Sequence, residues 1–283
     1  MKKLVVLLSF VMSLSAFGFV LQKEIEKAKA GDVVAQNALG EFYADGDGGK
    51  YKPNYELAIS WWEIAARNGS AKAHTNLGNM FYAGVVVQKN VPKAVQLWTE
   101  AAKRGDAVGQ YLRGNAYYKG LAVMPDMQTA TFWWNKSAEQ GNDRAQCNLA
   151  FAYAKGVGVA KRDTKKAFDL LKMSAEQGNE IAQVYLALAY FTGDAVEADP
   201  KKAVAIWHNA AELKGNADAI YYLGDATVSG KGTQKDIKKA FRYFSIAASR
   251  GHKLASQEVE KMRINFGALL LDEPKPANKK IKK

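Results

Sequence analysis

Apolar and small residues recur along this chain at the spacing of an α-helix, and they do not alternate with polar residues as in a β-strand. Short segments rich in glycine and helix-capping residues interrupt this pattern at regular intervals. Only 6 of the 283 residues are proline, so few positions are barred from helices by the loss of a backbone N–H. The pattern predicts an all-α protein built from many short helices.

Glycine marks a fixed period in this pattern. Seven leading glycines are separated by 36–38 residues, and another glycine follows fifteen residues after each of the first six. A constant period of this size indicates a solenoid. The leading glycines are Gly31, Gly69, Gly105, Gly141, Gly178, Gly215 and Gly251. The sequence therefore predicts six repeats, and positions within a repeat are given below as offsets from its leading glycine.

Each repeat is predicted to begin with a helix, helix A, that carries small residues on the side facing its neighbours. A small residue stands at offset four and Gly or Ala at offset nine. An aromatic residue stands at offset twelve in five of the six repeats, with Thr227 as the exception. Tiny side chains on one helical stripe allow another helix to approach closely.

A second helix, helix B, is predicted to follow a loop in each repeat. It starts after an Asn or Asp whose side-chain oxygen can accept the free backbone N–H groups of the first turn. Pro92 and Pro200 fall in that first turn, where proline is tolerated. The next leading glycine is expected to end the helix at the C′ position. The six capping residues are Asn54, Asn90, Asp126, Asp163, Asp199 and Asp236.

Helix B also carries a constant alanine and the bulky residues of each repeat. The alanines are Ala58, Ala94, Ala130, Ala167, Ala203 and Ala240. All six tryptophans of the chain fall on helix B. Because they recur at the same place in the repeat, core packing explains them better than a sugar or cofactor site. We expect Trp98→Ala to lower the free energy of unfolding by about 3–5 kcal/mol.

The two ends of the array are predicted to be capped. Residues 19–30 resemble the end of a helix B, and residues 251–271 resemble a lone, longer helix A. Terminal units of a solenoid have to cover a face that would otherwise be exposed. The six repeats then occupy residues 31–250, and a basic segment at 272–283 is predicted to be a disordered tail.

The first eighteen residues have the pattern of a secretory signal peptide. Lys2 and Lys3 precede an apolar run, and Ala16 and Gly18 place small residues before a cleavage site after Gly18. The alternative is an uncleaved membrane anchor, but the run is shorter than the roughly 20 apolar residues that span a bilayer. We predict a periplasmic or secreted protein with no membrane span after signal removal.

The formal net charge of +12 narrows the class of partner. Removing Lys2 and Lys3 with the signal takes it from +12 to +10. An exported chain is not expected to meet nucleic acid, so an acidic protein or an anionic envelope surface is the expected partner.

Cys147 is the only cysteine and cannot form an internal disulfide, so packing has to provide the stability. We interpret Cys147 as a buried thiol, with intermolecular pairing as the alternative.

The repeat pattern resembles the Sel-one-like repeat (SLR), a relative of the tetratricopeptide repeat. Two clear examples run from Gly69 to Gly105 and from Gly215 to Gly251. The resemblance implies a right-handed αα superhelix whose concave side recruits proteins, in bacteria often in the envelope and sometimes during host contact. One exported branch, once described as β-lactamase-like, has a disulfide in nearly every repeat. This chain departs from that branch because Cys147 stands alone.

No arrangement of catalytic or metal-binding residues is found. His74, His208 and His252 lie in different repeats, and none has a metal-ligand spacing to another or to Cys147. The repeats contain no Ser-x-x-Lys, which a penicillin-recognising enzyme uses. We predict no enzymatic activity and no cofactor.

A partial calcium loop is the nearest approach to a metal site. Asp45, Asp47 and Glu56 occupy positions one, three and twelve of an EF-hand, but Gly49 and Lys50 stand where a ligand and the required glycine belong. A flexible turn is the alternative interpretation of this segment.

If helix A lines the concave face as in tetratricopeptide repeats, offsets three, six, ten, thirteen and fourteen look outward. These positions are rich in Asn, Tyr and Lys, which suit an extended peptide. Packing between adjacent A helices is the alternative. We expect Asn79→Ala with Asn115→Ala to weaken partner capture without changing the melting temperature. The predicted strip is Asn37, Glu41, Lys72, Thr75, Asn79, Tyr82, Tyr111, Asn115, Tyr118, Lys119, Phe151 and Lys155, followed by Phe191, Tyr221 and Asp225.

The sequence thus predicts an exported repeat scaffold that binds a protein or peptide. Two other classes stay open: a module that binds peptidoglycan or another cell-wall glycan, and a hydrolase of the β-lactamase-like branch.

Overall fold

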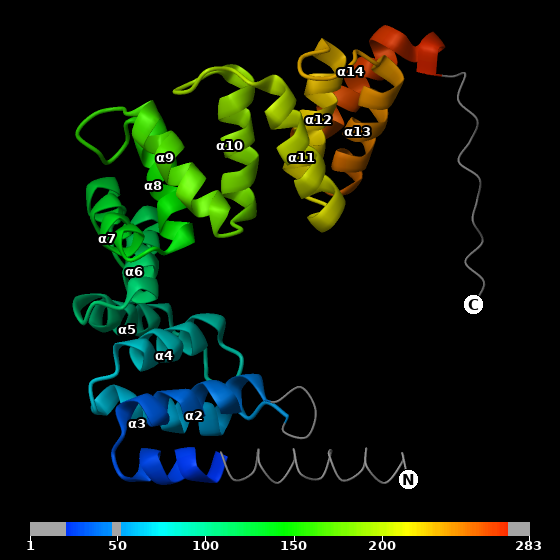
Figure 1. Cartoon of the computed structure of the whole chain (residues 1–283). Helices are drawn as coiled ribbons and strands as arrows, with labels where there is room; N and C mark the ends of the chain where they lie inside the picture. Colours follow the sequence, from blue (N-terminus) through cyan, green and yellow to red (C-terminus); the bar gives the residue numbers. More distant parts are fainter. Residues whose placement is uncertain (1–20, 47–51, 271–283) are drawn as a thin grey trace, which may run out of the picture. The chain divides into compact units, whose positions relative to one another are not determined.

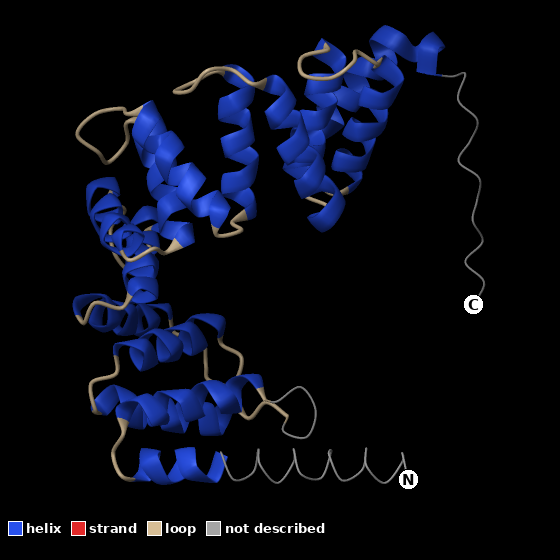
Figure 2. Ribbon diagram, in the orientation of Figure 1, coloured by secondary structure: helices blue, strands red, loops and turns tan. Residues whose placement is uncertain are grey.

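The computed structural model describes residues 21–46 and 52–270, and every regular element among them is an α-helix (Figures 1 and 2). The prediction of an all-α solenoid is confirmed for these residues. The A helices are α2 (Val33–Asp45), α4 (Ala71–Ala83), α6 (Ala107–Lys119), α8 (Asp143–Lys155), α10 (Glu180–Thr192) and α12 (Ala217–Ser229). The B helices are α3 (Tyr55–Arg67), α5 (Val91–Lys103), α7 (Met127–Glu139), α9 (Thr164–Glu176), α11 (Pro200–Lys214) and α13 (Ile237–Ser249).

Both helices of a repeat begin with a side-chain cap. The predicted caps of helix B are confirmed, as in α5, where Asn90 Oδ1 accepts the backbone N–H of Lys93 at 3.0 Å. Helix A starts in the same way, one residue after the leading glycine, although the sequence pattern did not single out these caps. They are Asp32, Ser70, Asp106, Asn142, Asn179 and Asn216.

The glycines end the helices because they adopt a left-handed backbone. The leading glycines have φ between +65° and +98°, and the glycines at offset fifteen have φ between +67° and +79°. A residue with a Cβ is strained at such angles. The predicted helix ends are confirmed, and their conformation explains the period of the sequence.

One backbone hydrogen bond closes the loop of all six repeats. The N–H of the residue that caps helix B donates to the carbonyl of the offset-twelve residue, at 2.6–3.1 Å. In the sixth repeat the acceptor is Thr227, the exception in the aromatic series. Its hydroxyl donates to the Leu223 carbonyl at 2.6 Å, which allows this polar side chain to be buried. The bond holds helix B in register with helix A.

Small and large residues interlock inside each repeat. A Cβ placed on Gly78 would lie 2.5 Å from the Trp98 ring. The same is true of the offset-nine glycines in repeats one, three and six, where an added Cβ would lie 2.3–2.7 Å from the facing ring of helix B. The constant alanines are 0–3% exposed. Core packing is confirmed for four tryptophans, Trp62, Trp98, Trp134 and Trp207. Trp61 and Trp133 precede the core position by one residue and are half-buried, and Trp61 packs against the cluster of Ala28, Ala35 and Leu39.

Glutamine at offset five joins each of four repeats to the end of the preceding helix B. Its Nε2 donates across eight residues to an alanine carbonyl in the last turn of that helix, at 2.9–3.4 Å. Each of these carbonyls also accepts the backbone N–H of the leading glycine at 2.9–3.1 Å, so the glutamine is its second donor. The donors are Gln36, Gln110, Gln146 and Gln183.

The chain divides into two compact units, one of residues 1–152 with 156–160 and the other of residues 153–155 with 161–283. In the first, residues 21–29 are helical, and Ala28 packs against Ala35 and Leu39 of α2. In the second, α14 (Lys253–Leu270) packs against α13 and is kinked at Phe266. The predicted signal peptide, the Lys-rich tail, and residues 47–51 of the partial calcium loop lie outside the described residues. None of the described helices is long and apolar enough to cross a membrane.

Candidate functional site

The predicted strip is best described on α2, α4 and α6 of the first unit. Its offset-six positions do not look outward: Asn37 is 7% and Thr75 is 3% exposed. The Thr75 hydroxyl donates to Asp106 Oδ2, at the start of the next helix A, at 2.7 Å. Offset six therefore faces the following repeat, and this part of the prediction is wrong. Tyr111, at the same offset, is half-buried.

The two asparagines at offset ten support the core. Trp98 Nε1 donates to Asn79 Oδ1 at 3.1 Å, and Trp134 Nε1 donates to Asn115 Oδ1 at the same distance. Asn115 Oδ1 also accepts from Asn148 Nδ2 of α8 at 3.1 Å. Because these amide oxygens satisfy buried indole N–H groups, we now expect their loss to change stability as well as any binding.

Two tyrosines at offset thirteen present their rings to solvent. Tyr82 is 38% exposed and Tyr118 is 55% exposed. Their ring centroids lie 5.3 and 5.6 Å from those of Trp98 and Trp134. Since these tryptophans are buried, each tyrosine rests on a rigid support. The two tyrosines belong to α4 and α6, which contact each other directly. We call Tyr82 and Tyr118 the tyrosine pair.

Charged side chains lie on the helices that carry the tyrosine pair and in the loop after Tyr82, but only Lys89 has a contact with one of the two rings. Lys72 of α4 forms an ion pair with Glu41 of α2 at 2.7 Å, and Lys89 Nζ lies 5.6 Å from the centre of the Tyr82 ring. Lys119 is exposed. Exposed ion pairs contribute little to stability, so these groups are available to steer an anionic partner.

Two further residues of the predicted strip belong to α8. Phe151 is half-buried on α8, and Lys155 is exposed in the second unit.

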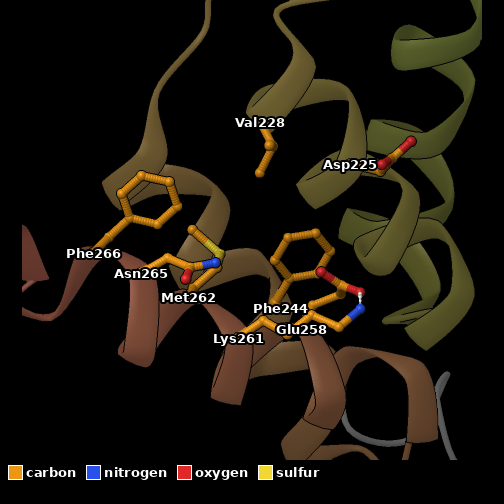
Figure 3. Close-up of a pocket in the computed structure, with 8 residues that line it drawn as sticks. All are labelled: Asp225, Val228, Phe244, Glu258, Lys261, Met262, Asn265 and Phe266. Carbon is orange, nitrogen blue, oxygen red and sulfur yellow. Dashed lines mark hydrogen bonds and ion pairs between the residues drawn. The ribbon is translucent and has the colours of Figure 1, made fainter.

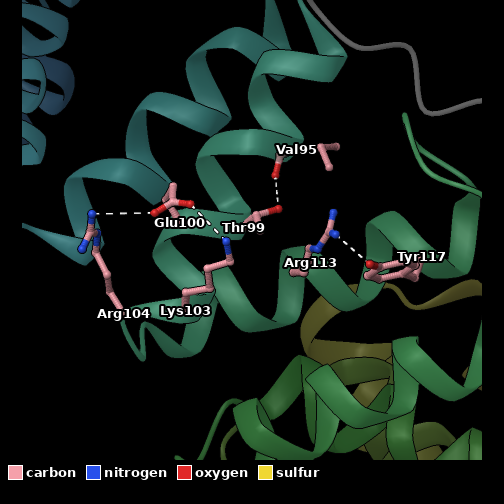
Figure 4. A network of polar contacts seen from close by, with 7 residues as sticks. All are labelled: Val95, Thr99, Glu100, Lys103, Arg104, Arg113 and Tyr117. Carbon is pink, nitrogen blue, oxygen red and sulfur yellow. Dashed lines mark hydrogen bonds and ion pairs between the residues drawn. The ribbon is translucent and has the colours of Figure 1, made fainter.

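Many other cations of the chain are held by aromatic rings. Lys93, Lys166 and Lys202 lie 4.0–4.3 Å from the centres of the offset-twelve rings of their own repeats. Figure 4 shows a related set on α5 and α6, in which Arg113 donates to the Tyr117 hydroxyl at 2.7 Å. In the same view, Glu100 forms ion pairs with Lys103 at 3.4 Å and Arg104 at 3.7 Å, one helical turn further along the chain. These contacts join helices or turns and do not form a catalytic group.

The histidines and the cysteine of the described residues do not form a metal site or a nucleophile–base pair. No group of three or more metal-binding side chains occurs among them. His74 Nδ1 lies 2.7 Å from the Ser70 carbonyl, and His252 Nδ1 accepts the Ala255 N–H at 3.0 Å. Cys147 is 3% exposed, and burial raises the pKa of its thiol to about 12. Such a thiol is a poor nucleophile.

Comparisons with known proteins agree with this architecture. The Sel1 repeat model matches residues 33–70, 71–106, 107–142, 143–179, 181–214 and 217–252. The chain is similar to the crystal structure of a Sel1 repeat protein from Oxalobacter formigenes, with 29% identity, a TM-score of 0.65, and coverage of 78% of this chain and 89% of the other. No curated protein sequence matches the chain.

A second similar structure is c5321, a protective antigen present in uropathogenic Escherichia coli strains that displays an SLR fold. The identity is 27%, the TM-score is 0.64, and the match covers 86% of this chain. The chain spans 59% of the length of that antigen.

Proposed function

The chain belongs to the Sel1-repeat family, and from that premise we propose that it holds an extended segment of another protein against the tyrosine pair. Sel1-repeat proteins generally act as protein-interaction scaffolds. The observation that carries the proposal is the pair of exposed rings, each supported by a buried tryptophan. A tyrosine fixed in this way provides a large amphipathic contact area and loses little conformational entropy on binding.

The spacing of the tyrosine pair suits an extended ligand. Packed helices lie about 8–10 Å apart, so rings at the same offset of α4 and α6 are separated by a similar distance. In a polyproline II segment, side chains three residues apart lie on one face at about 9 Å. Lys72, Lys89 and Lys119 favour an acidic segment, in line with the basic composition of the chain.

We place this interaction in the bacterial envelope or at the surface of a host. The support comes from the signal-peptide pattern of residues 1–18 and from the similarity to c5321, a protective antigen. No observation among the described residues favours glycan binding or hydrolysis over protein binding.

Affinity capture from an envelope extract, followed by mass spectrometry, tests the proposal. The purified chain without residues 1–18 is compared with Tyr82→Ala/Tyr118→Ala and with Phe132→Ala, a matched control that removes a ring 53% exposed on α7. We expect at least one protein to be reduced about tenfold by the double variant and retained by the control. Identical captured sets for all three proteins would overturn the proposal, as would capture of insoluble sacculus alone.

A further inference from the structure

A pocket of about 150 Å³ lies in the second unit, where α12, α13 and α14 meet. Figure 3 shows its lining: Val228 of α12, Phe244 of α13, and Met262 and Phe266 of α14 surround an apolar space. Asp225 and Glu258 contribute the acidic part of the lining. The pocket combines an apolar interior with carboxylates, a combination suited to a side chain that is apolar but has a polar end.

The same place is filled by the chain's own rings in repeats two and three. There, offset thirteen is tyrosine and offset twenty-nine is tryptophan, as in the contact between Tyr82 and Trp98. In the sixth repeat, these two offsets carry Val228 and Phe244. The first substitution removes a whole ring, and the second shortens an indole to a phenyl group. The pocket lies beside the two positions at which these changes remove aromatic volume.

The polar partner of the missing indole is still present. Asn79, at offset ten, accepts the indole N–H of Trp98. Asp225 stands at the same offset in the sixth repeat, but Phe244 has no N–H to donate, and Asp225 is an exposed residue at the edge of the pocket. No hydrogen bond within the described residues reaches the Asp225 carboxylate. Burial and the neighbouring Glu258 raise the pKa of Asp225, whereas Lys261 pairs with Glu258 at 2.7 Å.

We propose that this pocket binds an aromatic side chain of a partner protein, tryptophan or tyrosine, whose N–H or O–H donates to Asp225. A cavity of this volume is large enough to admit a benzene ring, and Lys261 and Asn265 add polar groups to its lining. The carboxylate replaces the asparagine that accepts an indole N–H in repeats two and three, and the partner's ring replaces the chain's own. The site lies in the second unit, so it does not depend on the tyrosine pair.

Binding of N-acetyl-tryptophanamide to the full chain tests this site. The methyl group of Met262, labelled with ¹³C and assigned with Met262→Leu, reports on the pocket wall. We expect a saturable shift of this methyl signal. Val228→Tyr fills the pocket with the ring of the other repeats and should weaken binding about tenfold or more. Val108→Tyr adds the same ring to an exposed position of α6 and should leave binding unchanged.

A second pair of variants separates blocking from unfolding. Phe244→Trp is expected to fit because Gly224 is glycine, as Gly78 is beneath Trp98, and it should also block the probe without lowering the melting temperature. Asp225→Ala should lower the affinity for N-acetyl-tryptophanamide about tenfold, which is the loss expected when a hydrogen bond to a charged group is removed. The proposal is overturned if no saturable Met262 shift occurs, if the folded pocket-filling variants bind normally, or if N-acetyl-leucinamide binds equally well.

Discussion

At the scale of single residues, the same tryptophan position is satisfied differently from repeat to repeat. Trp98 and Trp134 donate to asparagine, whereas Trp207 donates to the Val184 carbonyl at 3.1 Å. Trp62 Nε1 is buried without a hydrogen-bond partner among the described residues. In repeats two and three the asparagine at offset ten therefore has a structural role, because it accepts the indole N–H of the buried tryptophan.

We predict that Asn79→Ala lowers the free energy of unfolding by about 1–2 kcal/mol, because it leaves the Trp98 N–H without an acceptor. Asn76→Ala, on the same helix, is the control: it removes only a 3.5 Å hydrogen bond to Glu41 and should lower the free energy of unfolding by less than about 1 kcal/mol. Chemical denaturation measures both. In a Trp98→Phe background the effect of Asn79→Ala should largely disappear, and a full effect in that background would contradict the pairing.

Cys147 makes stability depend on pH in the alkaline range. Its pKa is raised from the ordinary 9.0 to about 12, first by burial and then by Asp143. Below pH 9 the thiol keeps its proton in both states, so it has no effect. Above pH 9 the unfolded chain loses the proton while the folded chain keeps it, so stability falls as pH rises toward 12.

We predict that the difference in unfolding free energy between the wild type and Cys147→Ala is constant below pH 9. Above that it should shift against the wild type by at most about 1.4 kcal/mol per pH unit. Denaturation at pH 7 to 10.5 measures it. A thiol reagent should react with the native chain only after unfolding, and fast labelling at pH 8 would show that the thiol is accessible.

At the scale of the helix, glycine has two separate roles. Leading glycines such as Gly69, with φ of +94°, end helix B and have open space around them. Glycines at offset nine lie within helix A, where they make room for a ring. A glycine in a helix interior is unfavourable by itself, so its presence there reflects the contact it permits.

Gly78→Ala is expected to destabilise the chain by about 1–3 kcal/mol, since its Cβ would overlap the Trp98 ring. Gly69→Ala is expected to destabilise it by about 1–2 kcal/mol through backbone strain. A double-mutant cycle with Trp98→Leu distinguishes the two causes. The Gly78 effect should shrink in that background and the Gly69 effect should not. Equal coupling of both glycines to Trp98 would refute this assignment.

At the scale of the whole molecule, stability is built from contacts between neighbouring helices. Helix A packs on helix B of its own repeat, and the offset-five glutamines join it to the repeat before. Each compact unit has buried clusters of its own. In such arrays, opening of one repeat is transmitted mainly to its neighbours.

Trp98→Ala should therefore open the first unit selectively. We expect the loss of about 3–5 kcal/mol to appear in hydrogen exchange as faster exchange in α4 to α7, with α10 to α13 retaining their protection. Trp207→Ala is the matched change in the second unit and should give the reverse pattern. Uniform loss of protection over both units in either variant would mean that the chain unfolds as one cooperative body.

The sequence by itself determined the repeat period, the A and B helices and the caps of helix B. These features depend on local geometry: a left-handed glycine, a capping oxygen or a run of helix-forming residues acts on the few residues beside it. The small residues of helix A and the bulky residues of helix B could also be predicted, because both recur within the repeat.

Only the tertiary structure decided which positions of helix A are exposed. Offset six is buried at Thr75 because the next helix A covers it, and offset ten is occupied because the indole of Trp98 or Trp134 binds there. The pocket beside Phe244 lies where Val228 replaces a tyrosine of other repeats and Phe244 replaces a tryptophan. Helical spacing predicts the direction in which a side chain points from its own helix. The volume and polarity of the neighbouring helices decide whether that direction leads to solvent, to the core or to an empty space.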